Sequence, residues 1–199
     1  MSFNILEKNI FLEKNGVMLT PLSLDHTEAL AEICKKGEFG KINTISTPDF
    51  MKMNVYVENA LQQKQQGIRY PFVVIDSNSK KIIGTTSYHD IIFAAKRLEI
   101  GYTWYAIEYQ RTHVNTTCKY LLLNYAFEVL KANTVGFRTD VLNFKSQKAI
   151  ERLGIHKDGI FRGNAIRKDG TIQDMFIYSV ILREWQVLEK KIIYLLSKY

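Results

Sequence analysis

The 199-residue chain lacks the features that define several special classes of protein. No apolar run approaches the roughly 20 residues that a helix needs to cross a bilayer, which argues against a membrane protein. Its first residues, "MSFNILEKNIFLEKNG", carry charges where a signal peptide needs an apolar stretch, so we expect a cytoplasmic protein. Only three prolines are present, and no Pro/Gly-rich linker divides the chain.

Cysteine is also scarce. Cys34 and Cys118 are the two cysteines, and both stand at apolar positions of expected helices. No second cysteine or histidine lies at metal-ligand spacing from either, which argues against a disulfide framework and against a zinc site. We therefore expect two buried free thiols and no bound metal.

Acidic residues are fewer than basic ones. The formal net charge is +7, which indicates an anionic ligand, either nucleic acid or a phosphorylated cofactor. The basic residues are scattered without a long run, and Tyr and Phe follow the periods of strands and helices. This distribution argues against nucleic acid as the main partner.

The order of elements predicts a mixed α/β fold. Asn15-Gly16 predicts a type I′ hairpin, and a second hairpin is expected near Asp169-Gly170. Strands are expected in "YPFVVID", "KIIGTTSYHDI", "RLEIGYTWYAI" and "TVGFRTDVL", and a helix in "FKSQKAIERLG". From Glu184 onward, apolar residues at helical spacing predict a C-terminal helix.

The stretch "YQRTHVNTTCKYLLL", residues 109–123, follows one of these strands and contains no glycine. Its apolar residues predict a helix, with Asn115 as N-cap. A helix N-terminus offers unpaired N–H groups and partial positive charge, and Arg111 adds a full charge, so an anion site is one interpretation. The other is an ordinary amphipathic helix that happens to have a cap and a nearby arginine.

The segment from "LEIGYTWY" through "DMFIYSVILREW" resembles the GNAT acetyltransferases, specifically their RimJ/RimL-like branch. The similarity covers roughly residues 17–185 and is most specific over 98–185. It implies a GNAT fold in residues 1–185, a mixed and mostly antiparallel sheet of about seven strands flanked by helices, with a helical extension at 186–199. The superfamily signature Q/R-x-x-G-x-G/A corresponds to Gln110–Asn115, where His113 and Asn115 stand in place of glycines.

The resemblance implies acetyl-CoA as co-substrate. Backbone N–H groups of the signature loop would hold the CoA pyrophosphate. Backbone groups of Trp104, Tyr105 and Ile107, at the end of the preceding strand, would pair with the pantetheine arm. The alternative for these three residues is that their side chains simply belong to the core. Lys119, Lys145 and Lys148 are candidate phosphate partners. The expected cofactor-binding residues are Trp104, Tyr105, Ile107, Gln110, Arg111, Thr112, His113, Val114, Asn115, Thr116, Asn143, Ser146 and Lys148.

The resemblance also implies candidate catalytic residues. Glu99, in "LEIGY", matches a general-base glutamate; its alternative role is a solvated charge or a salt bridge to Arg97 or Arg138. Strand alternation would place Glu99, Gly101 and Thr103 on one face and Leu98, Ile100, Tyr102 and Trp104 on the other.

Asn143 matches a family asparagine that contacts pantetheine or a water, or else is a turn residue. Where many members have a tyrosine that protonates the leaving thiolate, this chain has Ile150. In the RimJ/RimL-like branch, a serine at the position of Ser146 is the alternative proton donor to the thiolate; the other interpretation of Ser146 is a helix cap. Tyr178 is a weaker candidate for the proton donor. The thiolate can also leave without an acid. The four histidines (His26, His89, His113 and His156) are expected at the surface or in turns.

The expected function is direct acetyl transfer to a primary amine, either a protein N-terminus, as in ribosomal proteins, or a small amine or amino acid. The acceptor is expected to meet residues 37–55 and 160–173. One alternative is a GNAT fold without activity that binds CoA or a partner, and another is an RNA- or ribosome-associated protein. A monomer and a homodimer are both compatible with the sequence.

Overall fold

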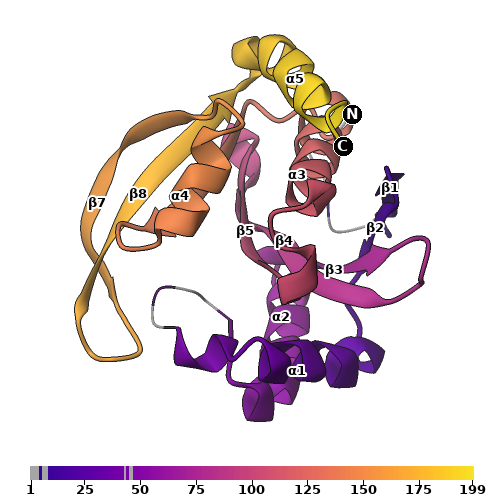
Figure 1. Ribbon diagram of the computed structural model, residues 1–199. Helices are drawn as coiled ribbons and strands as arrows, with labels where there is room; N and C mark the ends of the chain where they lie inside the picture. The colour runs from indigo at the N-terminus through magenta and orange to yellow at the C-terminus, as the bar shows by residue number, and fades with distance from the viewer. Residues whose placement is uncertain (1–4, 6–8, 43, 45–46) are drawn as a thin grey trace.

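The computed structural model describes residue 5, residues 9–42, residue 44 and residues 47–199, and it contains one eight-stranded sheet (Figure 1). The strands run in the order β1-β2-β3-β4-β5-β6-β8-β7, and every neighbouring pair is antiparallel except β5 and β6. This confirms the predicted fold, with eight strands where about seven were expected. The strands are β1 (Leu12–Lys14), β2 (Val17–Pro21), β3 (Arg69–Asp76), β4 (Ile82–Ile92), β5 (Arg97–Tyr105), β6 (Thr134–Asp140), β7 (His156–Ile166) and β8 (Ile172–Ile181).

Helices cover both faces of the sheet. They are α1 (Thr27–Lys36), α2 (Met53–Gln65), α3 (His113–Asn124), which continues into a π-helical turn η6 (Tyr125–Val129), α4 (Phe144–Glu151) and α5 (Leu182–Leu196). Short 3₁₀ turns are η1 (Leu24–His26), η2 (Phe39–Lys41), η3 (Phe50–Lys52), η4 (Phe93–Ala95) and η5 (Ile107–Tyr109). Within the described residues, no helix is long and apolar enough to span a membrane.

Two apolar clusters lie on opposite faces of the sheet. Successive residues of β3 divide between them: Phe72 belongs to the cluster that includes α3 and α5, and Val73 to the cluster that includes α1 and α2. Because strand side chains alternate between faces, α1 and α2 cover one face and α3 and α5 the other (Figure 1). The sheet is therefore the central layer of three.

Local sequence accounts for both predicted hairpins. Asn15 and Gly16 have φ values of +47° and +72°, and a type I′ turn requires positive φ at both of its central residues. At the β7–β8 turn, Gly170 has φ +85°. The C-terminal helix packs on its own chain, because Trp185, Leu188, Ile192 and Leu196 are buried in the same cluster as α3.

The two cysteines are buried in different clusters and are free, as predicted. Burial raises the pKa of each thiol to about 12, so both remain protonated at neutral pH.

Candidate functional site

β5 and β6 separate soon after they begin. They pair only where Arg97–Glu99 runs beside Thr134–Gly136, yet β5 continues to Tyr105 and β6 to Asp140. Beyond Glu99, the edge of β5 that faces β6 therefore has no strand partner in the described part of the chain. The space between the two strands beyond this point is called the opening below. Such an edge offers free N–H and C=O groups to an extended ligand.

A bulge in β5 changes which side chains face this opening. Tyr102 has φ +51°, and the pairing with β4 shifts there. Ile100 packs in the α3 cluster while Trp104 packs in the α1–α2 cluster, and Thr103 contacts Lys119 of α3. The predicted alternation is therefore wrong beyond Gly101, because the extra residue reverses the faces. Trp104 and Tyr105 have core side chains, which was one of the two expected roles.

The N-terminus of α3 lies at the end of this opening. The helix begins at His113, and its cap is Thr112, whose Oγ1 accepts from Val114 N at 3.3 Å. The prediction that Asn115 is the cap is wrong. Asn115 stands in the first turn, where its Oδ1 accepts a hydrogen bond from the Tyr105 hydroxyl at 3.4 Å. The first N–H groups of the helix remain without an intrahelical partner.

The turn before α3 explains how the chain does without the usual glycines. His113 and Asn115 are both helical, so neither position needs positive φ. The left-handed residue is Arg111, at φ +62°. His113 turns toward the β1–β2 hairpin, where its Nε2 lies 3.0 Å from the carbonyl oxygen of Asn15.

Other residues of the predicted loop have structural contacts. Gln110 Nε2 donates to the carbonyl of Tyr105 at 3.1 Å, and Ile107 is exposed. Thr116 is fully buried, and its Oγ1 accepts from Arg152, the C-cap of α4, at 2.5 Å. Thr116 therefore links α3 to α4 through its side chain.

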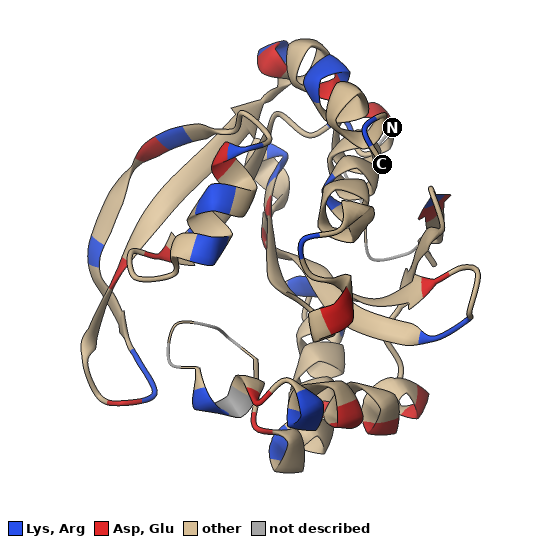
Figure 2. Cartoon of the chain, in the orientation of Figure 1, with Lys and Arg blue, Asp and Glu red and all other residues tan. Residues whose placement is uncertain are grey.

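Basic residues flank both sides of the opening, in the turn before α3 and on α4 (Figure 2). Arg111, Lys145 and Lys148 are all exposed there. This placement suits a ligand with several phosphates. Lys119 has a different setting, because its side chain is buried beneath the opening.

Glu99 lies at the point where β5 and β6 separate. The residue is 4% exposed, and its two carboxylate oxygens each lie 2.7 Å from an arginine nitrogen, one of Arg97 and one of Arg138. Arg138 also contacts Asp90. The salt-bridge alternative is thus present with both arginines. Its use as a general base stays a prediction.

His89 was expected at the surface or in a turn, and this is wrong. It lies in β4 directly opposite Glu99, and its side chain is 14% exposed. Burial lowers the pKa of His89 to about 4, with Arg138, Arg69 and Lys119 adding to the effect and Glu99 opposing it. The ring is therefore neutral at pH 7 and can accept a hydrogen bond. Pairing the two expected strands in sequence could have revealed this neighbour of Glu99.

A cleft of about 620 Å³ opens beside these charges. Its polar lining includes Asp90, Arg97, Glu99, Arg138 and Asn164, and its apolar lining includes Ile68, Ile91, Ile92, Phe93, Phe161 and Ile177. The cleft is therefore bordered by the connection between α2 and β3, by β4 and by the β7–β8 hairpin. It is large enough for a side chain or a small amine.

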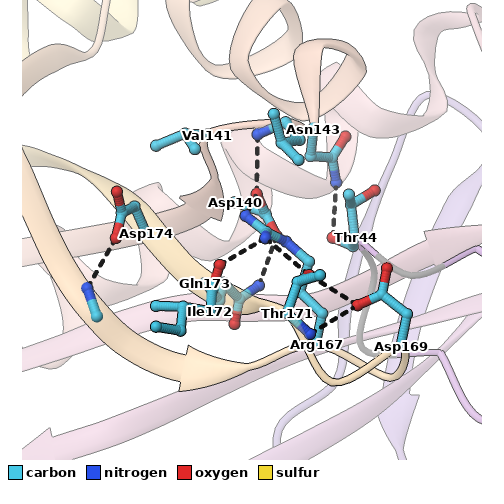
Figure 3. Close-up of polar contacts among 12 residues, drawn as sticks. Thr44, Asp140, Val141, Asn143, Arg167, Asp169, Thr171, Ile172, Gln173 and Asp174 are labelled. Carbon is cyan, nitrogen blue, oxygen red and sulfur yellow. Dashed lines mark hydrogen bonds and ion pairs between the residues drawn. The ribbon is translucent and has the colours of Figure 1, made fainter.

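Of the candidate residues at α4 and β8, Asn143 and Tyr178 already have side-chain partners, and Asn143 rather than Ser146 is the cap of α4. Asn143 caps α4 by accepting from Ser146 N at 3.1 Å. Its Nδ2 donates to Thr44 O at 3.3 Å (Figure 3). Ile150 is core, and the buried Tyr178 donates its hydroxyl to Glu151 at 3.0 Å. The turn role of Asn143 is present, while cofactor contact by Asn143 and proton donation by Ser146 or Tyr178 stay predictions.

A buried ion pair fixes the β7–β8 hairpin to the end of β6 (Figure 3). Asp140 accepts two bonds from Arg167, at 2.6 and 3.0 Å, and further bonds from Gln173 and from Leu142 N. Lys168, in the same hairpin turn, donates to Ile42 O and Thr47 O. The segments 37–55 and 160–173, where the acceptor is predicted to bind, therefore contact each other through Lys168.

Comparison with known proteins gives consistent matches. The family model for the acetyltransferase (GNAT) domain matches residues 17–156. The chain is 28% identical over 174 residues to the N-acetyltransferase YoaA of Bacillus subtilis, which is described as uncharacterized, covering 85% of this chain and 96% of YoaA.

Two solved structures share the fold. A GCN5-related N-acetyltransferase from Brucella melitensis superposes with a TM-score of 0.83 at 24% identity, covering 95% of this chain and 86% of that one. RimJ of Mycobacterium smegmatis in complex with CoA-disulfide has a TM-score of 0.78 at 14% identity, covering 94% and 93%.

Proposed function

Because the chain belongs to the GNAT acetyltransferase family, we propose that it transfers the acetyl group of acetyl-CoA directly to a primary amine. The observation that carries this proposal is the unpaired edge of β5 beyond Glu99, with the N-terminus of α3 at its end. An extended chain with a pyrophosphate at one end matches these two features.

The cofactor is proposed to lie along this edge. Backbone groups of Trp104, Tyr105 and Ile107 would pair with pantetheine, and residues 110–116 would hold the pyrophosphate. Support comes from the helix N-terminus, from the exposed Arg111, and from Lys145 and Lys148 on the other side of the opening (Figure 2). Binding through N–H groups explains why His113 and Asn115 can replace glycine.

The acceptor is proposed to enter through the 620 Å³ cleft, which Glu99 borders. The amine nitrogen must lose a proton as it attacks the thioester carbonyl. Glu99 and the neutral His89 beside it are the groups that could receive that proton, directly or through water. The arginines on Glu99 would then serve to hold the carboxylate in place.

The proposed acceptor is either a protein N-terminal amine or a small amine. The first follows from the resemblance to the RimJ/RimL-like branch, and the cleft between the end of α2 and the β7–β8 hairpin is compatible with an extended peptide. The second candidate function is CoA binding without turnover, which the apolar Ile150 in place of a donor favours.

Thiol release with an amine panel tests the proposal. Purified protein is mixed with acetyl-CoA and either peptides with free N-terminal Ala or Ser, free amino acids, or small primary amines. We expect amine-dependent release of CoA thiol and acetylated product by mass spectrometry. CoA binding by calorimetry without turnover on any amine would favour the inactive binding protein, and no binding at millimolar CoA would refute the cofactor assignment.

A further inference from the structure

A buried lysine lies at the floor of the opening. Lys119 is 6% exposed on α3, and its Nζ lies 3.2 Å from Thr103 Oγ1 of β5 and 5.3 Å from the ring centre of Phe137 of β6. Those two strands have already separated at this level, because their pairing ends at Glu99 and Gly136. The ammonium group therefore lies between the two strands, on the α3 side.

Few groups of the protein stabilise the charge of the Lys119 ammonium. In the described part of the chain it forms no salt bridge, and Thr103 is its one hydrogen-bond acceptor. Thr103 is itself shared, since its hydroxyl also pairs with Thr86 at 2.8 Å and donates to Gly101 O at 3.2 Å. An ammonium group has three N–H donors, so two remain for a ligand. A buried charge with so few partners is costly unless a further partner arrives.

The other titratable groups near Lys119 do not supply that partner. Cys118, on the same helix, is a buried neutral thiol, and His89 on β4 is neutral. The carboxylate of Glu99 on β5 is already paired with Arg97 and Arg138. Arg152, the C-cap of α4, is positively charged and is engaged with Thr116. The missing partner is therefore expected to be an anion from outside the chain.

We propose that Lys119 donates a proton to the sulfur of CoA during acetyl transfer, an inference that rests on the proposed function. The amine nitrogen forms its bond to the carbonyl carbon, and the carbon–sulfur bond breaks with its electron pair going to sulfur. The Lys119 ammonium gives that sulfur a proton, which yields free CoA thiol. Lys119 then regains a proton from solvent, and the amine's proton leaves through the acceptor side.

The pKa of Lys119 agrees with the role that its position indicates. Burial lowers the pKa of Lys119 to about 8, close to the roughly 8.5 of an ordinary thiol, so proton transfer between them is nearly balanced. The alternative donors are less suitable. Ile150 has no proton to give, the Tyr178 hydroxyl is bonded to Glu151, and a serine hydroxyl such as that of Ser146 is a poor acid.

Two variants test the role in turnover. Lys119→Met keeps the length of the side chain and removes an unpaired buried charge, so its melting temperature should not fall below that of the wild type. With the best amine of the panel, kcat should drop on the order of 100-fold while the Kd of acetyl-CoA stays within about threefold. The wild-type kcat should decline as pH rises through about 8, and Lys119→Met should lose that decline.

Lys119→Arg keeps the charge but cannot release a proton at these pH values. It should be as slow as Lys119→Met. Wild-type kcat in either variant would overturn proton donation, as would an acetyl group on Lys119 that is chased into the amine, because that would make Lys119 a nucleophile.

A second measurement needs no acceptor and keeps the two proposals distinguishable. At pH 8, the wild type should bind CoA about tenfold more tightly than desulfo-CoA, because a charge-assisted contact with the thiolate is present only in CoA. Lys119→Met should bind both equally. If CoA binds but neither protein discriminates between the two compounds, Lys119 does not contact the sulfur and the inference fails, even if the wild type acetylates amines.

Discussion

Asp140→Ala is expected to lower the free energy of unfolding by about 3–5 kcal/mol, because it leaves a buried arginine without its counter-ion. The Asp140 side chain is fully buried and that of Arg167 is 8% exposed. The carboxylate also accepts bonds from Gln173 and from Leu142 N, so four donors lose their acceptor at once (Figure 3). Urea unfolding monitored by circular dichroism measures the loss.

The controls separate loss of a partner from loss of a charge. Asp158→Ala removes an exposed carboxylate paired with His156 and should change stability by less than about 0.5 kcal/mol. The double variant Asp140→Ala/Arg167→Met should be more stable than Asp140→Ala alone, since no unpaired charge remains. A single variant as stable as the wild type would mean that the ion pair does not hold the hairpin.

The same pair predicts a pH dependence. Burial raises the pKa of Asp140, but hydrogen bonds from Arg167, Leu142 N and Gln173 outweigh burial and bring it below 3.8, its usual value. A folded-state pKa below the unfolded one stabilises the fold above the unfolded value, and this is lost as pH falls through the folded value. The difference between wild type and Asp140→Ala should thus be constant from pH 7 to 5 and shrink below pH 4.

Asn115→Asp is expected to weaken CoA binding by on the order of 10- to 100-fold while leaving the fold intact or slightly more stable. A carboxylate in the first turn of α3 complements the helix dipole, which contributes about 0.3–1 kcal/mol. The same charge repels a pyrophosphate held at that N-terminus. Stability and affinity therefore move in opposite directions, and calorimetry with thermal unfolding measures both.

Asn124→Asp is the matched control, because it makes the same chemical change at the last residue of α3. It should leave the Kd of CoA unchanged. Asn115→Ser, which is uncharged, should weaken binding less than about threefold. Equal loss of affinity in both aspartate variants would point to general repulsion, and an unaffected Asn115→Asp would place the pyrophosphate elsewhere.

Sequence pattern was sufficient for the order of elements and for both hairpins, because Asn15-Gly16 and Asp169-Gly170 specify their turns locally. It was not sufficient for the face of each side chain along β5. The bulge at Tyr102 arises where β5 leaves β6, and this depends on pairing between distant strands. Alternation assumes a regular strand and therefore failed beyond Gly101.

For the candidate site, too, sequence pattern predicted some features and missed others. The polar turn and the helix after it were predicted from residues 109–123, but the helix starts two residues before the expected cap, because the left-handed turn at Arg111 lets Thr112 take that role. The burial of Lys119 and His89 was not foreseen, since polar residues are usually exposed. Each is buried by elements distant in sequence, around the point where β5 and β6 part.

Hydrogen exchange with and without CoA tests whether the cofactor lies along the free edge of β5. CoA should slow exchange of backbone amides in Gly101–Tyr105 and at the start of α3, and leave those of the β1–β2 hairpin unchanged. CoA binding that protects a different region and leaves Gly101–Tyr105 exchanging as in the free protein would mean that the cofactor does not lie along β5.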